Sequence, residues 1–330
     1  MDKSALIYVA GHRGLVGSAI VRALKADGYT NIITRSHDEL DLTDAAATQA
    51  FFSAEVPQYV FLAAAKVGGI VANNTYPADF IRQNTAIQLN VIDSAWRAGA
   101  KRLLFLGSSC IYPKAAPQPM KEDYLLTGPL EATNRAYALA KIAGIEMCWS
   151  YNRQFGTRYL AAMPTNLYGP NDNYHATNSH VIPGLIRRFH EAAKDGTPRV
   201  SVWGSGKPRR EFLFSTDMAE ACIKLMTSDD AVFDRLLQTE RSKTDFIPPL
   251  VNIGSGVDLT IQELAEAIKA TIGYKGEIVF DPSLPDGTPR KLMDISKIAE
   301  FGWRPKVGLT EGLKLAYADY LSTLDVSSSG

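Results

Sequence analysis

Short apolar runs alternate with longer amphipathic segments through the first half of the chain. The runs predict buried strands at Ala5–Ala10, Asn31–Arg35, Tyr59–Ala65, Arg102–Gly107 and Arg158–Met163. Apolar residues at helical spacing predict helices over Leu15–Ala26, Ala45–Ala54, Ile81–Ala98 and Ala132–Arg153. Strands that alternate with helices, with connections long enough for a crossover, indicate an α/β fold with a parallel sheet covered on both faces.

The second half of the chain is less regular. Helices are expected at Ile182–Ala193, Thr216–Thr227, Ile261–Ala270 and Thr310–Leu321, with a strand at 200–203. Pro- and Gly-rich stretches predict loops at 112–130, 169–180, 204–210 and 281–290, and ordered loops of this length are more often functional than not. The stretch 233–249 matches no pattern, and the tail 327–330 is expected to be disordered.

Composition and charge narrow the class of protein. Of the 330 residues, 46% are hydrophobic and 21% charged, which excludes disordered, collagen-like and coiled-coil chains. Lys plus Arg and Asp plus Glu are 35 each, so neither nucleic acid nor an anionic membrane is expected as a partner. No apolar run is long enough for a membrane span. The 3 cysteines are odd in number and widely spaced, which predicts no disulfide framework, no metal site and a reducing cytoplasm.

Glycine recurs at every third position directly after the first predicted strand. The segment reads Gly11-His12-Arg13-Gly14-Leu15-Val16-Gly17 and opens a predicted helix. Glycine is needed where such a turn is tight and where backbone approaches a pyrophosphate, and the helix N-terminus adds free N–H groups. In its strand–turn–helix context this segment predicts a dinucleotide site. The alternative is a glycine-rich turn that binds nothing.

The segment after the second predicted strand distinguishes the two nicotinamide dinucleotides. NAD-binding proteins place Asp or Glu there, against the ribose 2′-hydroxyl. This chain has Arg35 instead, and Arg13 lies within the glycine turn. A cation suits a 2′-phosphate and therefore favours NADP. A solvated surface charge is the alternative for Arg35. Asp41 and Leu42 are then expected near the adenine ring.

A tyrosine and a lysine four residues apart lie in the helix that follows the Arg102–Gly107 strand. This spacing places Tyr137 and Lys141 on one helical face, where an ammonium is expected to lower the pKa of the phenol. The bare pattern arises by chance, but Ser108 falls just past the preceding strand, where open α/β sheets build their sites. Together these residues predict hydride transfer to or from a carbonyl; a buried helical aromatic is the alternative for Tyr137.

Several longer motifs are shared with a known family. They read Ala-Ala-Ala-Lys-Val-Gly-Gly-Ile-Val-Ala-Asn-Asn at 63–74, Gly-Ser-Ser-Cys-Ile-Tyr-Pro at 107–113, Met-Pro-Thr-Asn-Leu-Tyr-Gly-Pro at 163–170, Asn-Ser-His-Val-Ile-Pro at 178–183, Val-Trp-Gly-Ser-Gly at 202–206 and Pro-Asp-Gly-Thr-Pro-Arg-Lys at 285–291. With the glycine turn and the Tyr/Lys pair, the chain resembles the extended short-chain dehydrogenase/reductase superfamily, and within it the GDP-L-fucose synthase family.

The resemblance implies a fold and a reaction. The fold is a Rossmann-type, doubly wound parallel sheet that carries NADP over residues 1–170, with some later segments returning to it. A smaller C-terminal α/β substrate domain spans 171–330. The reaction is epimerisation of GDP-4-keto-6-deoxy-D-mannose at C3 and C5, followed by reduction at C4 with NADPH. The family implies a homodimer.

The resemblance also implies roles for individual residues. Ser108, Tyr137 and Lys141 match the reductase triad, and Cys110 and His180 match the epimerase base and acid. The positions matching GDP-sugar contacts are Arg188, Trp203, Arg210 and Asp286. Those matching cofactor contacts, besides the glycine turn, are Leu106, Gly107, Ser108, Ser109, Lys141, Pro164, Thr165, Asn166, Leu167 and His180. By residue type alone, a lone Cys or His is more often structural.

Two other readings remain open. A nucleotide-sugar 4-epimerase or 4,6-dehydratase shares the glycine turn and the Tyr/Lys pair, although a dehydratase has an acid pair where Ser109 and Cys110 stand. A non-catalytic NADP-sensing protein shares the fold but typically loses Tyr or Lys of the pair. The family often has a second Arg where His37 stands, which weakens the expected 2′-phosphate clamp.

Overall fold

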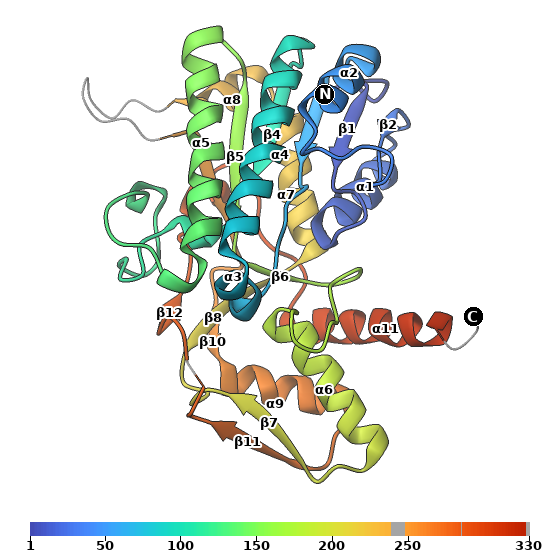
Figure 1. Cartoon of the computed structure of the whole chain (residues 1–330), viewed down its shortest axis with the longest axis vertical. Coiled ribbons are helices and arrows are strands. Elements are labelled where there is room, and N and C mark those ends of the chain that lie inside the picture. Colours follow the sequence, from blue (N-terminus) through green and yellow to red (C-terminus); the bar gives the residue numbers. More distant parts are fainter. Residues whose placement is uncertain (239–247, 285, 328–330) are drawn as a thin grey trace.

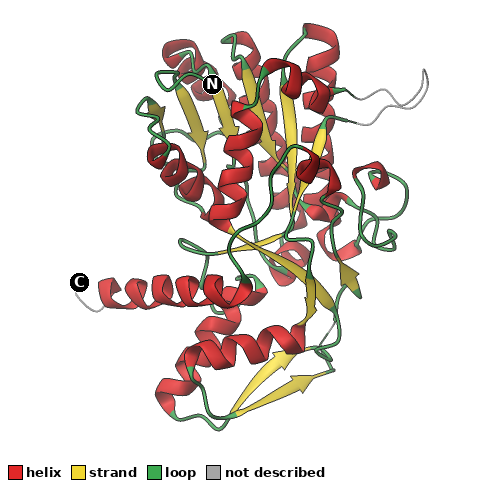
Figure 2. Cartoon of the chain, turned by 180° about the vertical axis from the view of Figure 1, so that it is seen from behind, coloured by secondary structure: helices red, strands yellow, loops and turns green. Residues whose placement is uncertain are grey.

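The computed structural model describes residues 1–238, 248–284 and 286–327. Its first unit is built on a six-stranded sheet of order β2-β1-β3-β4-β5-β9, in which every pair is parallel. The strands are β1 (Ile7–Ala10), β2 (Ile32–Ile33), β3 (Tyr59–Leu62), β4 (Arg102–Leu106), β5 (Tyr159–Pro164) and β9 (Leu250–Ile253). Figure 2 shows these strands running toward the second unit, so their carboxyl ends meet at that side.

Helices cover both faces of this sheet, as Figure 1 shows. One face packs on α2 (Ala45–Glu55), α4 (Pro77–Arg97) and α5 (Arg135–Phe155); the other packs on α1 (Leu15–Ala26), α7 (Ser215–Thr227), α8 (Asp230–Leu237) and α10 (Ser296–Glu300). Successive strand residues point to opposite faces. Tyr8 accordingly packs in the core on the α4 side, whereas Ile7 and Val9 pack in the core on the α1 side.

The second unit carries two smaller sheets. The first has the order β10-β8-β12, with β6 also paired to β8, and the second pairs β11 with β7. Its strands are β6 (Asn166–Tyr168), β7 (Arg199–Trp203), β8 (Arg209–Phe214), β10 (Asp258–Thr260), β11 (Glu277–Asp281) and β12 (Arg290–Lys291). Its helices α6 (Val181–Asp195), α9 (Ile261–Ile272) and α11 (Leu309–Ser327) close a separate core around Phe189, Phe212 and Leu264. The short helix α3 (Ile70–Thr75) lies between the two units in Figure 1.

The chain returns to the first unit after it has begun the second. Helix α7 packs against α1, and β9 pairs with β5, so residues beyond 170 complete the first sheet. Strand β9 could not be placed from the sequence, because it is only four residues long. Residues 239–247 of the unmatched stretch 233–249 lie outside the described residues. Residue 285 and residues 328–330 of the predicted tail lie outside them as well.

Two predicted loops end earlier than expected. Strand β8 starts at Arg209, inside the predicted loop 204–210, and β12 starts at Arg290, at the end of the predicted loop 281–290. Strand β8 was not predicted, because its first three residues, Arg209, Arg210 and Glu211, are charged and do not form an apolar run. Glu211 is nevertheless fully buried and accepts hydrogen bonds from the N–H groups of Gly256 and Met293. Among the described residues, no helix is long and apolar enough to cross a membrane.

Candidate active site

The glycine turn joins β1 to α1 and is shaped by steric limits. Gly11 has a φ of +83°, and a Cβ there would lie 2.7 Å from the Ala64 nitrogen. A Cβ on Gly17 would lie 2.1 Å from the Gly11 carbonyl oxygen. Gly14 has more room, since a Cβ there would lie 3.6 Å from the Gly11 carbonyl oxygen, and it begins α1 without a side-chain cap. The N–H groups of the first turn of α1 therefore face no capping side chain and suit a phosphate.

Two cations lie where a 2′-phosphate is expected. Hydrogen bonds from Ser36, with the nearby charges of Arg35 and Arg13, hold the pKa of Glu39 below its usual range. Arg35 also pairs with Glu55 and lies over the Phe51 ring, with 5.3 Å between its guanidinium carbon and the ring centroid. The ion pair shows that Arg35 is not a freely solvated charge.

The other predicted cofactor residues of this region make local contacts. The Asp41 carboxylate accepts hydrogen bonds from the Thr43 N–H at 2.9 Å and hydroxyl at 2.8 Å. Leu42 is buried, and its carbonyl oxygen accepts a hydrogen bond from the Asn90 side-chain amide at 2.9 Å. Nδ1 of His12 is buried with no hydrogen-bond partner among the described residues, and burial lowers the pKa of this imidazole. Contact of Asp41 and Leu42 with adenine stays a prediction.

The predicted reductase residues converge at the carboxyl end of β4. The Ser108 hydroxyl accepts a hydrogen bond from the Cys110 N–H at 3.3 Å and so caps the short 3-10 turn Ser109–Ile111. Lys141 is buried on α5, and its Nζ donates to the Leu106 carbonyl at 2.7 Å and lies 5.8 Å from the centre of the Tyr137 ring. Ser108, Cys110, Tyr137 and Lys141 thus form one cluster.

The pKa of Tyr137 departs from the sequence expectation. Burial raises it, the neighbouring Cys110 raises it further, and the hydrogen bond with Ser108 acts in the opposite direction. Burial also lowers the pKa of Lys141 to about 7, so near neutrality this side chain is not a fully charged ammonium. The expected lowering of the phenol pKa is therefore wrong for the protein's own groups, because desolvation outweighs the lysine.

The segment Pro164–Leu167 crosses from β5 of the first unit to β6 of the second. The Thr165 N–H donates to the Ile253 carbonyl at 3.0 Å. The Asn166 amide donates to the Glu211 carbonyl at 2.8 Å. Beside it, a Cβ on Gly107 would lie 2.1 Å from the Met163 Cε, so the end of β4 approaches the end of β5 closely. The predicted cofactor segments 106–109 and 164–167 therefore follow adjacent strands.

His180 begins α6 and lies on the loop that meets the 63–74 motif. Its carbonyl accepts a hydrogen bond from the Gly184 N–H, and the preceding residue Ser179 approaches Gly69 so closely that a Cβ there would be 2.9 Å from the Ser179 carbonyl oxygen. The imidazole retains solvent-accessible surface, yet surrounding protein lowers its pKa by desolvation. Among the described residues, no hydrogen bond or ring contact joins His180 to Cys110. Their pairing as acid and base therefore stays a prediction.

The four predicted substrate residues fall into two pairs. The Arg188 guanidinium carbon lies 5.8 Å from the centre of the Trp203 ring, and Trp203 is 48% exposed. The Arg210 guanidinium donates to the Asp286 carbonyl at 3.3 Å, while the Asp286 carboxylate accepts from the Ser205 N–H at 2.6 Å. Burial lowers the pKa of both arginines. Within the described ranges the hydrogen bonds of both guanidinium groups go to backbone carbonyls and not to carboxylates, so both groups can also bind phosphate.

Comparison with known proteins decides the family. Residues 7–235 match the model of the "NAD dependent epimerase/dehydratase family". "Putative GDP-L-fucose synthase 2" of Arabidopsis thaliana is 57% identical over 98% of this chain and 94% of its own length. "GDP-L-fucose synthase" of Escherichia coli K12 is 54% identical, over 97% of each chain. This chain belongs to the GDP-L-fucose synthase family. Both the predicted family and the Rossmann-type fold are confirmed.

A solved structure of similar shape extends the comparison. The structure titled "MlghC, GDP-mannoheptose C4 reductase from Campylobacter jejuni with NADP bound" has a TM-score of 0.87 and is 39% identical. The matched region spans 97% of this chain and 99% of the chain in that structure. Membership of the family says nothing directly about each side chain, so the residue roles remain predictions.

One contact to the cluster was not predicted from the sequence. The Asn134 amide nitrogen lies 3.2 Å from the Cys110 sulfur. Asn134 ends the 3-10 turn Ala132–Asn134 and precedes α5. The only sequence signal was its place three residues before Tyr137, at the start of a predicted helix, where Asn is common for a different reason.

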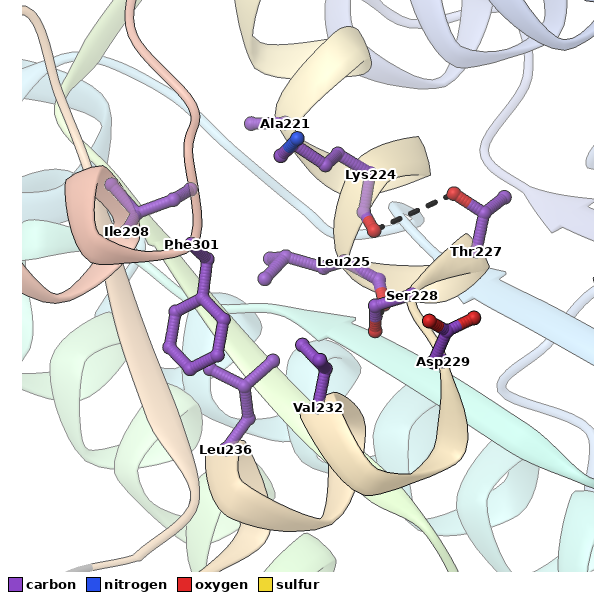
Figure 3. Close-up of a pocket in the computed structure, with 10 residues that line it drawn as sticks. All are labelled: Ala221, Lys224, Leu225, Thr227, Ser228, Asp229, Val232, Leu236, Ile298 and Phe301. Carbon is purple, nitrogen blue, oxygen red and sulfur yellow. Dashed lines mark hydrogen bonds between the residues drawn. The ribbon is translucent and has the colours of Figure 1, made fainter.

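A cavity lies away from the cluster, between α7, α8 and α10 (Figure 3). Its volume is about 320 Å³, and its lining combines apolar side chains with Lys224, Thr227, Ser228 and Asp229. No predicted site residue lines it. In the part of the chain that the structure describes, no group of three or more His, Cys, Asp or Glu side chains could hold a metal ion.

Proposed function

We propose that this chain converts GDP-4-keto-6-deoxy-D-mannose to GDP-L-fucose at a single site, by epimerisation at C3 and C5 and reduction at C4 with NADPH. The observation that carries the proposal is the convergence of Ser108, Cys110, Tyr137 and Lys141 at the carboxyl end of β4, in a member of this family. It is an oxidoreductase acting on a CH–OH group with NADP as acceptor, and an isomerase as well.

Epimerisation uses the acidity that a 4-keto group gives to its neighbouring carbons. The Cys110 thiolate removes the proton from C3 or C5, and the C–H electron pair moves into the enolate, with the charge on the C4 oxygen. Ser108 and Tyr137 donate hydrogen bonds to that oxygen. The His180 imidazolium then returns a proton to the opposite face of the carbon, and the ketone re-forms. After the first inversion Cys110 is a thiol and His180 a neutral imidazole, so the thiol gives a proton to solvent and the imidazole takes one from solvent before the second inversion.

Reduction uses the same polar groups on the same oxygen. NADPH, when bound, supplies the hydride that adds to C4. The Tyr137 hydroxyl gives its proton to the C4 oxygen as the C=O bond becomes C–OH, and Ser108 holds that oxygen in place. Lys141, held to the Leu106 carbonyl beneath the ring, stabilises the phenolate that remains. The same two hydroxyl groups, those of Ser108 and Tyr137, therefore bind the C4 oxygen in both halves of the reaction.

The residues at the end of β1 and β2 fit NADP. The uncapped first turn of α1 suits the pyrophosphate, and the buried, unpartnered Nδ1 of His12 can take a ligand hydrogen bond. Arg13 and Arg35 supply positive charge for a 2′-phosphate. In the second unit, Arg188 and Arg210 suit a diphosphate, and Trp203 offers an exposed ring on which a nucleobase can stack.

We also propose a homodimer in the cytoplasm. Helices α4 and α5 pack side by side and expose apolar side chains at Ile81, Leu89, Leu139 and Phe155. A pair of chains would cover this face. The three free cysteines, with Cys110 needed as a thiolate, suit a reducing compartment. Light scattering across a concentration series should give twice the chain mass, and Leu89→Glu with Leu139→Glu should give monomers. A monomeric wild type would contradict the dimer.

One incubation tests the function itself. The protein is mixed with GDP-4-keto-6-deoxy-D-mannose and NADPH, and the product sugar is identified by NMR. GDP-L-fucose, formed with one NADPH oxidised per sugar, is expected. Product without net NADPH oxidation would instead indicate a 4-epimerase or dehydratase that recycles its cofactor. No turnover by protein that binds NADP would favour the sensing protein.

A further inference from the structure

The side chain in contact with the Cys110 sulfur does not make the contacts usual for its position. Asn134 is the N-cap of α5, where an Asn oxygen normally accepts a hydrogen bond from the backbone N–H two or three residues on. Here no side-chain cap forms, and the amide nitrogen lies 3.2 Å from Sγ of Cys110. The helix therefore begins without the benefit that Asn offers it.

The other end of the same amide is left without a partner. Oδ1 of Asn134 is buried and accepts no hydrogen bond from any described residue. A buried, unpaired amide oxygen costs free energy. An amide that forgoes both the cap and a donor for its oxygen stabilises the fold poorly. In this geometry the Asn134 amide keeps its contact with the Cys110 sulfur, and it makes neither the cap nor, among the described residues, a hydrogen bond through its own oxygen.

An N–H donor favours the charged form of the sulfur it points at. Hydrogen bonds to the ionised form of a group lower its pKa, and thiolates are the reactive form of cysteine. Lys141 does not take this part, because its Nζ is bound to the Leu106 carbonyl. Cys148 and Cys222 are fully buried on helices, and burial raises the pKa of both thiols, whereas Cys110 is only partly buried.

We propose that Asn134 is a positioning residue for the epimerisation half of the reaction: its amide N–H stabilises the Cys110 thiolate and fixes the direction of the sulfur. This inference rests on the proposed function only for its effect on the sugar. The hydrogen bond to the thiolate can be tested without substrate.

The test follows the pH dependence of thiol alkylation. Iodoacetamide reacts with thiolates, so the rate at Cys110 reports its thiolate fraction, with Cys110→Ser as the blank. In Asn134→Ala the midpoint should rise by about one pH unit, and in Asn134→Asp by at least as much, because a carboxylate then faces the sulfur. Thr133→Val, one residue earlier in the same turn, should keep the wild-type midpoint.

A second readout joins the thiol to the sugar. Deuterium incorporation at C3 and C5 from D₂O is measured near neutral pH, and both Asn134 variants should exchange about tenfold more slowly, following the thiolate fraction. NADPH affinity should not change. Asp has the same shape as Asn but lacks the N–H donor, so Asn134→Asp decides the matter if the Ala variant fails to fold.

The outcomes separate this inference from the proposed function. Unchanged alkylation midpoints in folded Asn134 variants overturn the role of Asn134, whatever the enzyme does. Wild-type rates of deuterium exchange in those variants overturn it as well. If instead the wild type shows no exchange, or Cys110→Ser exchanges normally, the epimerase assignment fails while the thiol titration still decides the hydrogen bond.

Discussion

Two loops at the same edge of the first sheet are built by different means. The turn after β1 is made of backbone, because Gly11 and Gly17 leave no room for a Cβ and α1 starts without a cap. The loop after β4 is made of side-chain contacts, from Ser108 to the Cys110 N–H and from Asn134 to the Cys110 sulfur. The first loop is defined by sterics, and the second by a small polar network.

This difference separates binding from chemistry. A cofactor's phosphates need fixed N–H groups, which a rigid turn supplies without any ionisable residue. Proton transfer needs groups whose charge changes, and their pKa values depend on burial and on neighbours. Tyr137 and Lys141 illustrate this dependence, since desolvation moves both away from their usual values in opposite directions. Variants in the two loops should therefore fail in different ways.

The largest effect is expected where the proton donor is removed. Tyr137→Phe should lower the rate of NADPH oxidation about 1000-fold, because positioned general acids contribute about 10²–10⁴. Exchange at C3 and C5 should persist, since Cys110 and His180 remain. Stopped-flow absorbance of NADPH and NMR of deuterium uptake measure the two halves. Normal reduction in this variant would remove Tyr137 from the role of proton donor.

The turn after β1 should respond through stability. Gly17→Ala puts a Cβ against the Gly11 carbonyl oxygen, which is backbone and cannot rotate away. We expect a loss of about 3 kcal/mol in the free energy of unfolding, similar to other overpacked sites. The matched control is Gly14→Ala, whose Cβ has room and should cost less than about 1 kcal/mol. Urea denaturation measures both, and equal losses would contradict the steric account of this turn.

The same contrast explains what could be predicted from the sequence. The glycine turn, the strands before it and after it, and the Tyr137/Lys141 pair follow from local spacing, and the parallel sheet follows from their alternation. Strand β9 could not be placed, because four residues carry too little pattern and their partner β5 is far away in the chain. Nor could the role of Asn134, because an Asn near the start of a helix is typical of a cap, and only the fold brings it to Cys110.

A smaller effect is expected at the cationic end of β2. Arg35→Ala should raise the KM for NADPH about tenfold and leave that for NADH unchanged, because only NADPH carries a 2′-phosphate. Glu55 competes for the same guanidinium. Glu55→Gln should therefore bind NADPH at least as tightly as the wild type, which makes it the matched control. Equal losses for NADPH and NADH in Arg35→Ala would mean that Arg35 supports the fold and not the phosphate.

The smallest effect, taken per pH unit, concerns how the buried lysine couples folding to pH. The pKa of Lys141 is about 7 in the folded chain, well below the usual 10.5, because burial disfavours the charged form. Between these values the unfolded chain binds the extra proton, so the contribution of Lys141 to the stability of the wild type should rise with pH from about 7 toward 10. Lys141→Met lacks the group. The difference in unfolding free energy, wild type minus variant, should therefore increase from pH 7 to 9 by about 1 kcal/mol per pH unit. Tyr137→Phe retains the lysine and should keep the wild-type slope. Urea unfolding at pH 7, 8 and 9 measures all three proteins, and a difference that stays flat would mean that Lys141 remains a charged ammonium in its place beneath the tyrosine.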